Sequence, residues 1–146
     1  MGSERTPRAF AEIEIGDEIG PVVRVPSLEV VQRYAAATGL TDRRFIDPER
    51  ARQTGFLKPI VPGPLSATFL AQMLTDHFTG WRLRSLNTSF RAPVGHGDPL
   101  ICWGTVTEKS WHAGVATIHC DLIAENQQGE RVIVGTATLS RREPSL

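Results

Sequence analysis

The sequence predicts an α+β fold in which an antiparallel sheet wraps around one long central helix. Two observations carry this prediction: a helical segment over residues 65–78 that is apolar around most of its circumference, and four later runs in which apolar and polar residues alternate. A helix that is apolar on most faces is buried on most faces. A single sheet buries such a helix by wrapping around it, so the two patterns together favour this layered arrangement.

The first part of the chain predicts two short strands and a helix. Residues 10–15 are interpreted as a short strand or extended arm, and residues 22–25 as a second strand. Ser27 is a good N-cap for a helix whose apolar residues recur at helical spacing. Gly39 then ends that helix, as glycine commonly does.

The segment over residues 40–64 is irregular, and a long ordered loop in a compact domain is usually functional. Asp47 followed by Pro48 is typical of a helix start, so we expect a short helix over residues 49–53. The apolar central helix over residues 65–78 follows this loop.

Four strands follow the central helix, and turn-forming stretches that each contain glycine separate them. Strands joined by short turns are expected to form an antiparallel meander. One sheet on one helix leaves open strand edges, so we expect at least a dimer. The predicted strands are residues 83–90, 100–107, 115–124 and 132–139.

The composition fits one compact domain, because 146 residues with 40% hydrophobic content bury a core without disulfide or metal support. We expect a single domain over residues 1–146, with its core at about 10–140. The 16 basic and 16 acidic residues cancel, so no nucleic-acid partner is expected. No apolar run approaches the roughly 20 residues of a membrane span, so no membrane partner is expected either.

Cysteine usage and the start of the chain predict a cytoplasmic location. Cys102 and Cys120 fall in predicted strands, where we expect reduced core residues. The first five residues are polar and do not form a signal peptide. No histidine–cysteine pair has zinc-ligand spacing, and no phosphate loop or dinucleotide fingerprint is present, so we expect no metal and no cofactor.

Several short motifs occur in a fixed order along the chain. They are Tyr-Ala-Ala-Ala-Thr-Gly at 34–39, Asp-Pro-Glu-x-Ala at 47–51, Gly-Phe at 55–56, Pro-Ile-Val-x-Gly-x-Leu at 59–65 and Phe-Arg-Ala-Pro-Val-x-x-Gly-Asp at 90–98. In this order and spacing they resemble the MaoC-like, or (R)-specific enoyl-CoA hydratase, family of hot-dog folds. The resemblance extends from about Phe10 to Leu139.

The resemblance implies chemistry on an acyl thioester of coenzyme A or acyl carrier protein. Members add water to a trans-2-enoyl thioester or remove it from a 3-hydroxyacyl thioester. These reactions need a carboxylate and an imidazole to move protons. They also need a donor for the thioester oxygen, a role that suits a backbone N–H at the start of the central helix. Here the segment is Val61-Pro62-Gly63-Pro64, in which Gly63 keeps an N–H and both prolines lack one.

The family's catalytic motif reads small residue, Gly, Asp, any residue, Asn, Pro, apolar residue, His. When it is laid on the Thr-Gly at 38–39, Leu40 takes the Asp position and Phe45 takes the His position, while Asp42 and Arg43 take the Asn and Pro positions. Leucine and phenylalanine carry no protons, so the resemblance implies that the Asp/His dyad is missing. Leu40 and Phe45 would then line the acyl pocket or plug it.

The altered loop offers two further candidates. Asp42 could act as a displaced general base, although its neighbours Arg43 and Arg44 favour a simpler interpretation as an arginine-paired loop residue. Arg43 and Arg44 could bind a coenzyme A phosphate, since a guanidinium fork suits phosphate oxygens, or could form a solvated turn. Lys58 and Arg91 are weaker candidates for the same phosphate.

Around the central helix, Val61 and Ser66 are candidates for substrate binding. Ser66 could also be a thioesterase nucleophile, but no base is assigned to it, so a serine in the first turn of a helix is the simpler interpretation. His77 ends the predicted helix, where its charged form would favour the helix dipole.

Three hypotheses follow. The first is a family member without the dyad, either a non-catalytic subunit of a heterodimer with a dyad-bearing hot-dog partner or a homodimer with altered chemistry. The second is an active enoyl-CoA hydratase or 3-hydroxyacyl-thioester dehydratase with Asp42 as base. The third is a thioesterase on the same fold.

Overall fold

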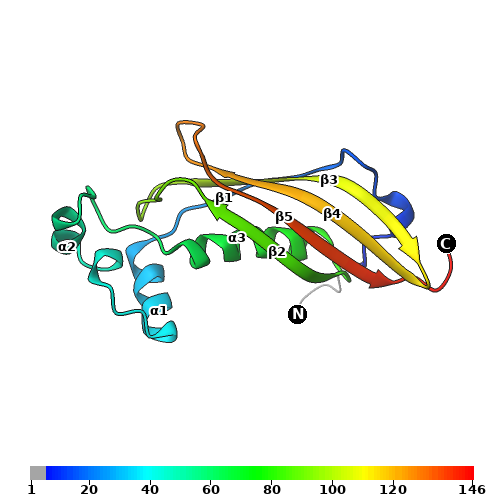
Figure 1. Cartoon of the computed structure of the whole chain (residues 1–146), viewed down its shortest axis with the longest axis horizontal. Coiled ribbons are helices and arrows are strands. Elements are labelled where there is room, and N and C mark those ends of the chain that lie inside the picture. The colour runs from blue at the N-terminus through cyan, green and yellow to red at the C-terminus, as the bar shows by residue number, and fades with distance from the viewer. Residues whose placement is uncertain (1–5) are drawn as a thin grey trace.

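The central helix lies beneath a five-stranded antiparallel sheet that arches over it, as the sequence predicted (Figure 1). The computed structural model describes residues 6–146, so the polar start of the chain lies outside the described residues. The helix, α3, spans Gly63–His77 and begins two residues before the predicted start. It runs from the side of the molecule that carries two smaller helices toward the side that carries the C-terminus (Figure 1).

The sheet has the strand order β1-β3-β4-β5-β2. The three strands β3, β4 and β5 form the expected meander, but β2 pairs with β5 rather than with β3. The predicted four-strand meander is therefore wrong at its first strand. The connection over residues 91–99 is longer than a hairpin loop and takes the chain across the sheet to β3, which lies next to the opposite edge strand β1. The strands are β1 Glu18–Arg24, β2 Arg82–Phe90, β3 Leu100–His112, β4 Val115–Glu125 and β5 Arg131–Arg142.

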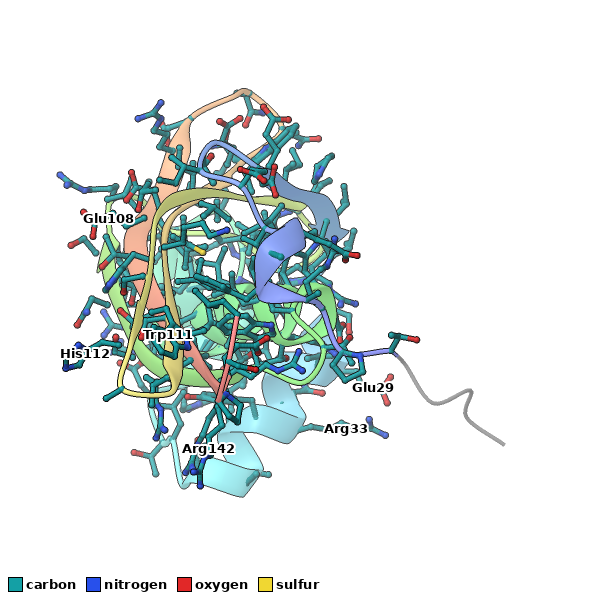
Figure 2. All side chains as sticks on the ribbon, turned by 90° about the vertical axis from the view of Figure 1, so that its right-hand side faces the viewer. Glu29, Arg33, Glu108, Trp111, His112 and Arg142 are labelled. Atoms are coloured by element: carbon teal, nitrogen blue, oxygen red, sulfur yellow. The ribbon has the colours of Figure 1, made fainter. Side chains whose placement is uncertain are left out.

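The β3–β4 hairpin is longer than predicted. Trp111 and His112, expected in a turn, end β3 at the tip of the hairpin (Figure 2). The turn is reduced to Ala113 and Gly114, whose φ angles are 50° and 79°. Two consecutive residues at positive φ are what a tight two-residue hairpin requires.

The predicted strand or arm over residues 10–15 is wrong, because Phe10–Glu12 form a 3₁₀ helix, η1. Phe10 and Ile13 are both buried in the core. Residues three apart lie on the same side of a 3₁₀ turn, so this conformation buries both side chains together. The next strand, β1, begins at Glu18 and is longer than the predicted residues 22–25.

The two smaller helices match the sequence signals that predicted them. The helix α1, Leu28–Thr38, is capped by Ser27, whose Oγ accepts the Val30 N–H at 3.2 Å. The helix α2, Pro48–Gln53, is capped by Asp47. Both helices lie beyond one end of the sheet (Figure 1). Glu29 and Arg33 of α1 project outward into solvent, so that face of the helix covers nothing (Figure 2).

The core lies between α3 and the concave face of the sheet, with Leu70, Met73 and Leu74 of the helix fully buried. Cys102 and Cys120 lie in this core as free thiols, which confirms their prediction as reduced core residues. Burial raises the pKa of Cys102 to about 11 and that of Cys120 to about 12, so neither forms a thiolate near neutral pH. Within residues 6–146, no helix combines the length and apolar character needed to cross a membrane.

Candidate functional site

A cavity of about 420 Å³ opens where α3 begins. Four parts of the chain form it: one residue of the loop before α2, the segment that leads into α3 together with its first turn, the end of β2 with the residues after it, and one residue of β5. Most of its wall is apolar, which suits a hydrocarbon ligand. The apolar wall includes Phe45, Ile60, Val61, Phe90, Val94 and Ile133.

Backbone pairing holds two sides of this cavity together. The Val61 N–H donates to the Val94 carbonyl at 2.7 Å, and Ile60 forms an isolated antiparallel bridge with Gly95. The segment that enters α3 is therefore fixed against the segment that leaves β2. This pairing sets the distance between the helix start and the end of the strand.

Gly63, the first residue of α3, carries a free backbone donor. Its N–H has no acceptor among the described residues, Pro62 provides no side-chain cap, and Pro64 has no N–H. A Cβ atom at Gly63 would lie 2.9 Å from the Phe90 ring, so a larger residue fits there only if that ring moves. The free N–H also lies at the positive end of the helix dipole, where a developing negative charge is stabilised.

Ser66, one turn further along α3, carries a second unused polar group. The residue is 2% exposed, and its Oγ has no hydrogen-bond partner. By contrast, the Thr68 hydroxyl of the same helix donates to the Leu65 carbonyl at 2.6 Å, the usual local solution for a hydroxyl in a helix. An unsatisfied buried hydroxyl costs about 1–3 kcal/mol. Ser66 therefore offers a hydrogen bond that the protein itself does not use.

No carboxylate or imidazole belongs to the described residues that line the cavity, and Arg91 is the only charged residue among them. The wall therefore contains no group that moves protons near neutral pH. Nor does the described part of the chain bring together three or more histidine, cysteine or acidic side chains in a position to hold a metal ion.

The predicted catalytic loop lies beside this cavity, and its charged side chains bind one another. Asp42 caps the 3₁₀ helix η2, Arg43–Phe45, by accepting the Arg44 N–H at 3.1 Å. Its other oxygen lies 2.8 Å from Arg44 Nε, but that N–H does not point at it, so the contact is an ion pair only. Arg43 pairs with Asp47 at 2.6 Å.

The four predicted phosphate-binding cations differ in whether a carboxylate already pairs with them. Arg43 and Arg44 are ion-paired within the loop, and Lys58 Nζ lies 2.6 Å from an Asp98 oxygen. The guanidinium of Arg91 forms no ion pair or hydrogen bond with any described residue, although its backbone N–H donates to Val132. Arg91, a weaker candidate from the sequence, is therefore the cation left free at the cavity.

The structure thus divides the predicted site residues into two groups. Four of them line the cavity, namely Phe45, Val61, Gly63 and Ser66, and four do not, namely Leu40, Asp42, Arg43 and Arg44. The sequence interpretation missed Phe90 and Ile133 as site residues. Phe90 stands in the Phe-Arg-Ala-Pro-Val motif, which was interpreted only as a strand and turn, and Ile133 gives no signal beyond that of a core strand residue.

The far end of α3 has a different character. Burial and the nearby Arg8 guanidinium, whose nitrogen lies 3.4 Å from Nε2, lower the pKa of His77. This direction is opposite to the one expected from the helix dipole, because desolvation and a neighbouring cation both disfavour the charged imidazole. His77 therefore does not provide the expected charged end of the helix.

Residues 12–138 match the protein family described as the MaoC like domain. A mitochondrial 3-hydroxyacyl-[acyl-carrier-protein] dehydratase of Arabidopsis thaliana is 32% identical over 89 residues, which cover 61% of this chain. The matched part spans 53% of that relative, or about half its length.

Solved structures share the fold over most of the chain. The (R)-hydratase from A. caviae involved in PHA biosynthesis superposes with a TM-score of 0.79 at 25% identity, covering 88% of this chain and 96% of that one. A chain of the ChsH1-ChsH2 complex from Mycobacterium tuberculosis superposes with a TM-score of 0.75 at 18% identity, covering 88% and 98%. The second likeness concerns the fold alone.

Proposed function

The chain belongs to the MaoC-like domain family of hydratases and dehydratases, and from this premise we propose that it binds an acyl thioester of coenzyme A or acyl carrier protein in the cytoplasm. The observation that carries the proposal is the cavity at the start of α3. An apolar wall suits the acyl chain, and the free Gly63 N–H suits the thioester oxygen.

Each group at the cavity then has a role in binding. The Gly63 N–H donates to the thioester oxygen, where the helix dipole adds to the stabilisation. Val61, Phe45 and Ile133 contact the acyl chain. The guanidinium of Arg91 at the cavity binds a phosphate of the carrier, since this cation has no competing carboxylate among the described residues.

We further propose that the chain alone does not catalyse hydration or dehydration. Both reactions need a proton acceptor and a proton donor at the substrate, and no described residue of the wall supplies either. The family motif laid on the sequence, which puts Leu40 and Phe45 at the dyad positions, supports this proposal. The protein then acts as the partner of a dyad-bearing hot-dog subunit, which provides the carboxylate and the imidazole.

The alternative chemistries have less support. A thioesterase role for Ser66 needs a neighbouring base, and the described residues of the cavity wall include none. A role for Asp42 as base needs a carboxylate that reaches the substrate, whereas this carboxylate caps η2 and pairs with Arg44. Both alternatives require turnover by the chain on its own.

The test is to mix the purified chain with short and medium trans-2-enoyl-CoA. We expect calorimetry to detect binding, and the conjugated enoyl absorbance to persist. Co-expression with a dyad-bearing hot-dog subunit should give a complex that removes this absorbance. Absence of binding contradicts the proposed ligand. Turnover by the single chain contradicts the partner role, and Asp42→Ala would then be the first variant to assay.

A further inference from the structure

The outer face of the sheet, opposite the face that covers α3, is apolar over part of its area. Strands that are apolar without alternation are typical of sheets covered on both faces. Such runs occur in three neighbouring strands, as Leu-Ile-Cys-Trp at 100–103, Leu-Ile-Ala at 122–124 and Val-Ile-Val at 132–134. The helices α1, α2 and α3 lie beneath the sheet or beyond its end, so none of them covers the outer face (Figure 1).

Trp103 is the largest side chain in these three runs. Its neighbour Cys102 is buried in the core, and adjacent strand residues project to opposite faces, so Trp103 projects from the outer face. Trp103 is the cross-strand partner of Ile123, and Ile123 is the partner of Val134. The three residues therefore form one apolar row over β3, β4 and β5, and each of them is only partly buried.

The indole N–H of Trp103 has no acceptor among the described residues, unlike those of the other two tryptophans. Trp81 donates to the Arg8 carbonyl at 2.8 Å, and Trp111 donates to the Glu143 carbonyl at 2.6 Å. Tryptophan is enriched at interfaces because its ring makes apolar contacts while its N–H finds a hydrogen-bond partner. Trp103 therefore has the properties of an interface residue.

A hollow of about 450 Å³ lies in the same outer face, on the other side of β4 from Trp103. Its wall comes from β2, β4 and β5. Ile123 and Val134 form an apolar part of this wall, while Ser89 and Asp121 provide hydrogen-bond acceptors. The hollow thus offers an indole ring both an apolar surface and an acceptor for its N–H.

The positions of Trp103 and the hollow suit a two-fold axis that runs along β4. The strands β3 and β5 are the two neighbours of β4, and Trp103 and Val134 both belong to the row of Ile123. When two copies stack outer face to outer face around such an axis, β3 of each copy lies over β5 of the other. Stacked sheets lie about 10 Å apart with nearly aligned strands, so each Trp103 then faces the hollow of the other copy.

We propose that a second copy of this chain packs on the outer face, with Trp103 of each copy seated in the hollow of the other. The ring contacts Ile123 and Val134, and the indole N–H reaches the acceptors in the wall. Asp121 and Arg131 both line the hollow, so the two carboxylates near the axis are accompanied by two guanidinium groups.

This contact goes beyond the proposed function and does not rest on it. The cavity for the thioester opens at the start of α3, on the opposite side of the sheet. The edge strands β1 and β2 also stay free for the edge pairing that the sequence predicts. Stacking of the outer faces is therefore compatible with both a ligand in the cavity and a partner at a strand edge.

The experiment measures the particle mass by light scattering during size-exclusion chromatography, over a range of protein concentrations. The unmodified chain should form particles of at least two copies. Trp103→Thr removes the ring and introduces a residue that suits a strand. It should halve the mass, whether from four copies to two or from two copies to one. The association constant of the lost contact should fall about thirtyfold or more.

Thr136→Arg tests the other half of the contact, because Thr136 is an exposed residue of the hollow. Its long charged side chain fills the hollow and should halve the mass while Trp103 is unchanged. An equal mixture of the two variants should regain part of the association, since one intact ring then meets one intact hollow. The smaller side chain at position 103 of the other variant leaves room for the arginine.

Trp111→Ala is the matched control. Trp111 is 39% exposed and lies at the tip of the β3–β4 hairpin, outside the proposed contact, so its loss should leave the mass unchanged (Figure 2). An unmodified chain that stays a single copy at every concentration overturns the inference. So does either folded variant, Trp103→Thr or Thr136→Arg, that keeps the full mass, or a mixture of the two that stays at the halved mass.

Thioester binding separates this inference from the proposed function. Trp103→Thr and Thr136→Arg should bind a thioester as the unmodified chain does, within about twofold, because neither residue lines the cavity. If no thioester binds to any of the three proteins while the masses change as expected, the proposed function fails and the stacked pair stands. If the thioester binds and the masses do not change, only the stacked pair fails.

Discussion

The loop before α2 and the start of α3 differ in how their polar groups are satisfied. In the loop, Asp42 pairs with Arg44 and Arg43 pairs with Asp47. At the start of α3, the Gly63 N–H and the Ser66 hydroxyl have no partner among the described residues. In the sequence, the charged loop is the more obvious candidate for a functional site, but its charged side chains already pair with each other. Under the proposed function, unused donors rather than charge mark the ligand site.

Among the substitutions that test this comparison, Gly63→Ala should have the largest effect on thioester affinity. The new Cβ meets the Phe90 ring at 2.9 Å and forces it across the cavity, so thioester affinity should fall about tenfold or more in calorimetry. Stability should change by less than about 1 kcal/mol, because the half-exposed ring can take a new position without disturbing the core and alanine favours the helix. Combining Gly63→Ala with Phe90→Ala should recover part of the affinity, and no recovery would contradict this account.

Ser66→Ala should separate function from stability. Removing an unpartnered buried hydroxyl should raise the free energy of unfolding in urea by about 1 kcal/mol, since its desolvation cost disappears. Thioester affinity should fall in the same variant. Thr68→Val is the control, because it removes a hydroxyl that donates to Leu65, and it should leave stability unchanged or lower. A loss of stability in Ser66→Ala would mean that its hydroxyl is satisfied in the free protein.

His77, at the far end of α3, should make the stability of the protein depend on pH. Burial, and to a smaller extent Arg8, lower the pKa of His77 in the folded protein. Between this lowered pKa and the ordinary value of 6.5, the imidazole is therefore protonated in the unfolded chain but neutral in the folded protein. Stability therefore rises with pH through the window between the lowered pKa and 6.5, is complete above it and is lost below it. His77→Gln should flatten this slope in urea titrations between pH 5 and pH 7, a range set by the usual titration of histidine. An unchanged slope would assign the pH dependence to another group.

Asp42→Asn should have the smallest effect. Asparagine keeps the cap on η2 and loses only an ion pair that is partly solvated, so the free energy of unfolding should change by less than about 1 kcal/mol. Thioester affinity should stay within about twofold. A loss of turnover in any complex that contains this variant would instead identify Asp42 as a base.

The elements defined by local signals could be predicted from the sequence. Ser27, Asp47 and Gly39 define helix ends through interactions within a few residues, and the structure has them where the sequence indicated. The place of β2 in the sheet could not be predicted, because it depends on pairing with β5 far along the chain. Residues 10–15 were misinterpreted as a strand or extended arm because two apolar patterns are hard to tell apart over so few residues. One is the alternation of apolar and polar residues in a strand, and the other is the pair of buried residues three apart in a 3₁₀ turn.

The site was predictable in part for the same reason. Gly63 and Ser66 belong to a local signal, the start of an apolar helix after a proline-rich loop. Phe90 and Ile133 meet at the cavity because they are cross-strand partners in the β2–β5 pair, a long-range pairing that no short pattern encodes. The pairing of Asp42 with Arg44 was one of two interpretations, and only the folded geometry distinguishes an occupied carboxylate from a free one.

The bridge between Ile60 and Gly95, with the hydrogen bond from Val61 to Val94, has a consequence for how this site can diverge between related proteins. The bridge ties the helix entrance to the strand exit, so the spacing of the two backbones is a fixed frame. Under the proposed function, ligand preference then varies through the side chains within the frame and not through a change in its width. New specificities are thus reachable through single substitutions that leave the scaffold intact.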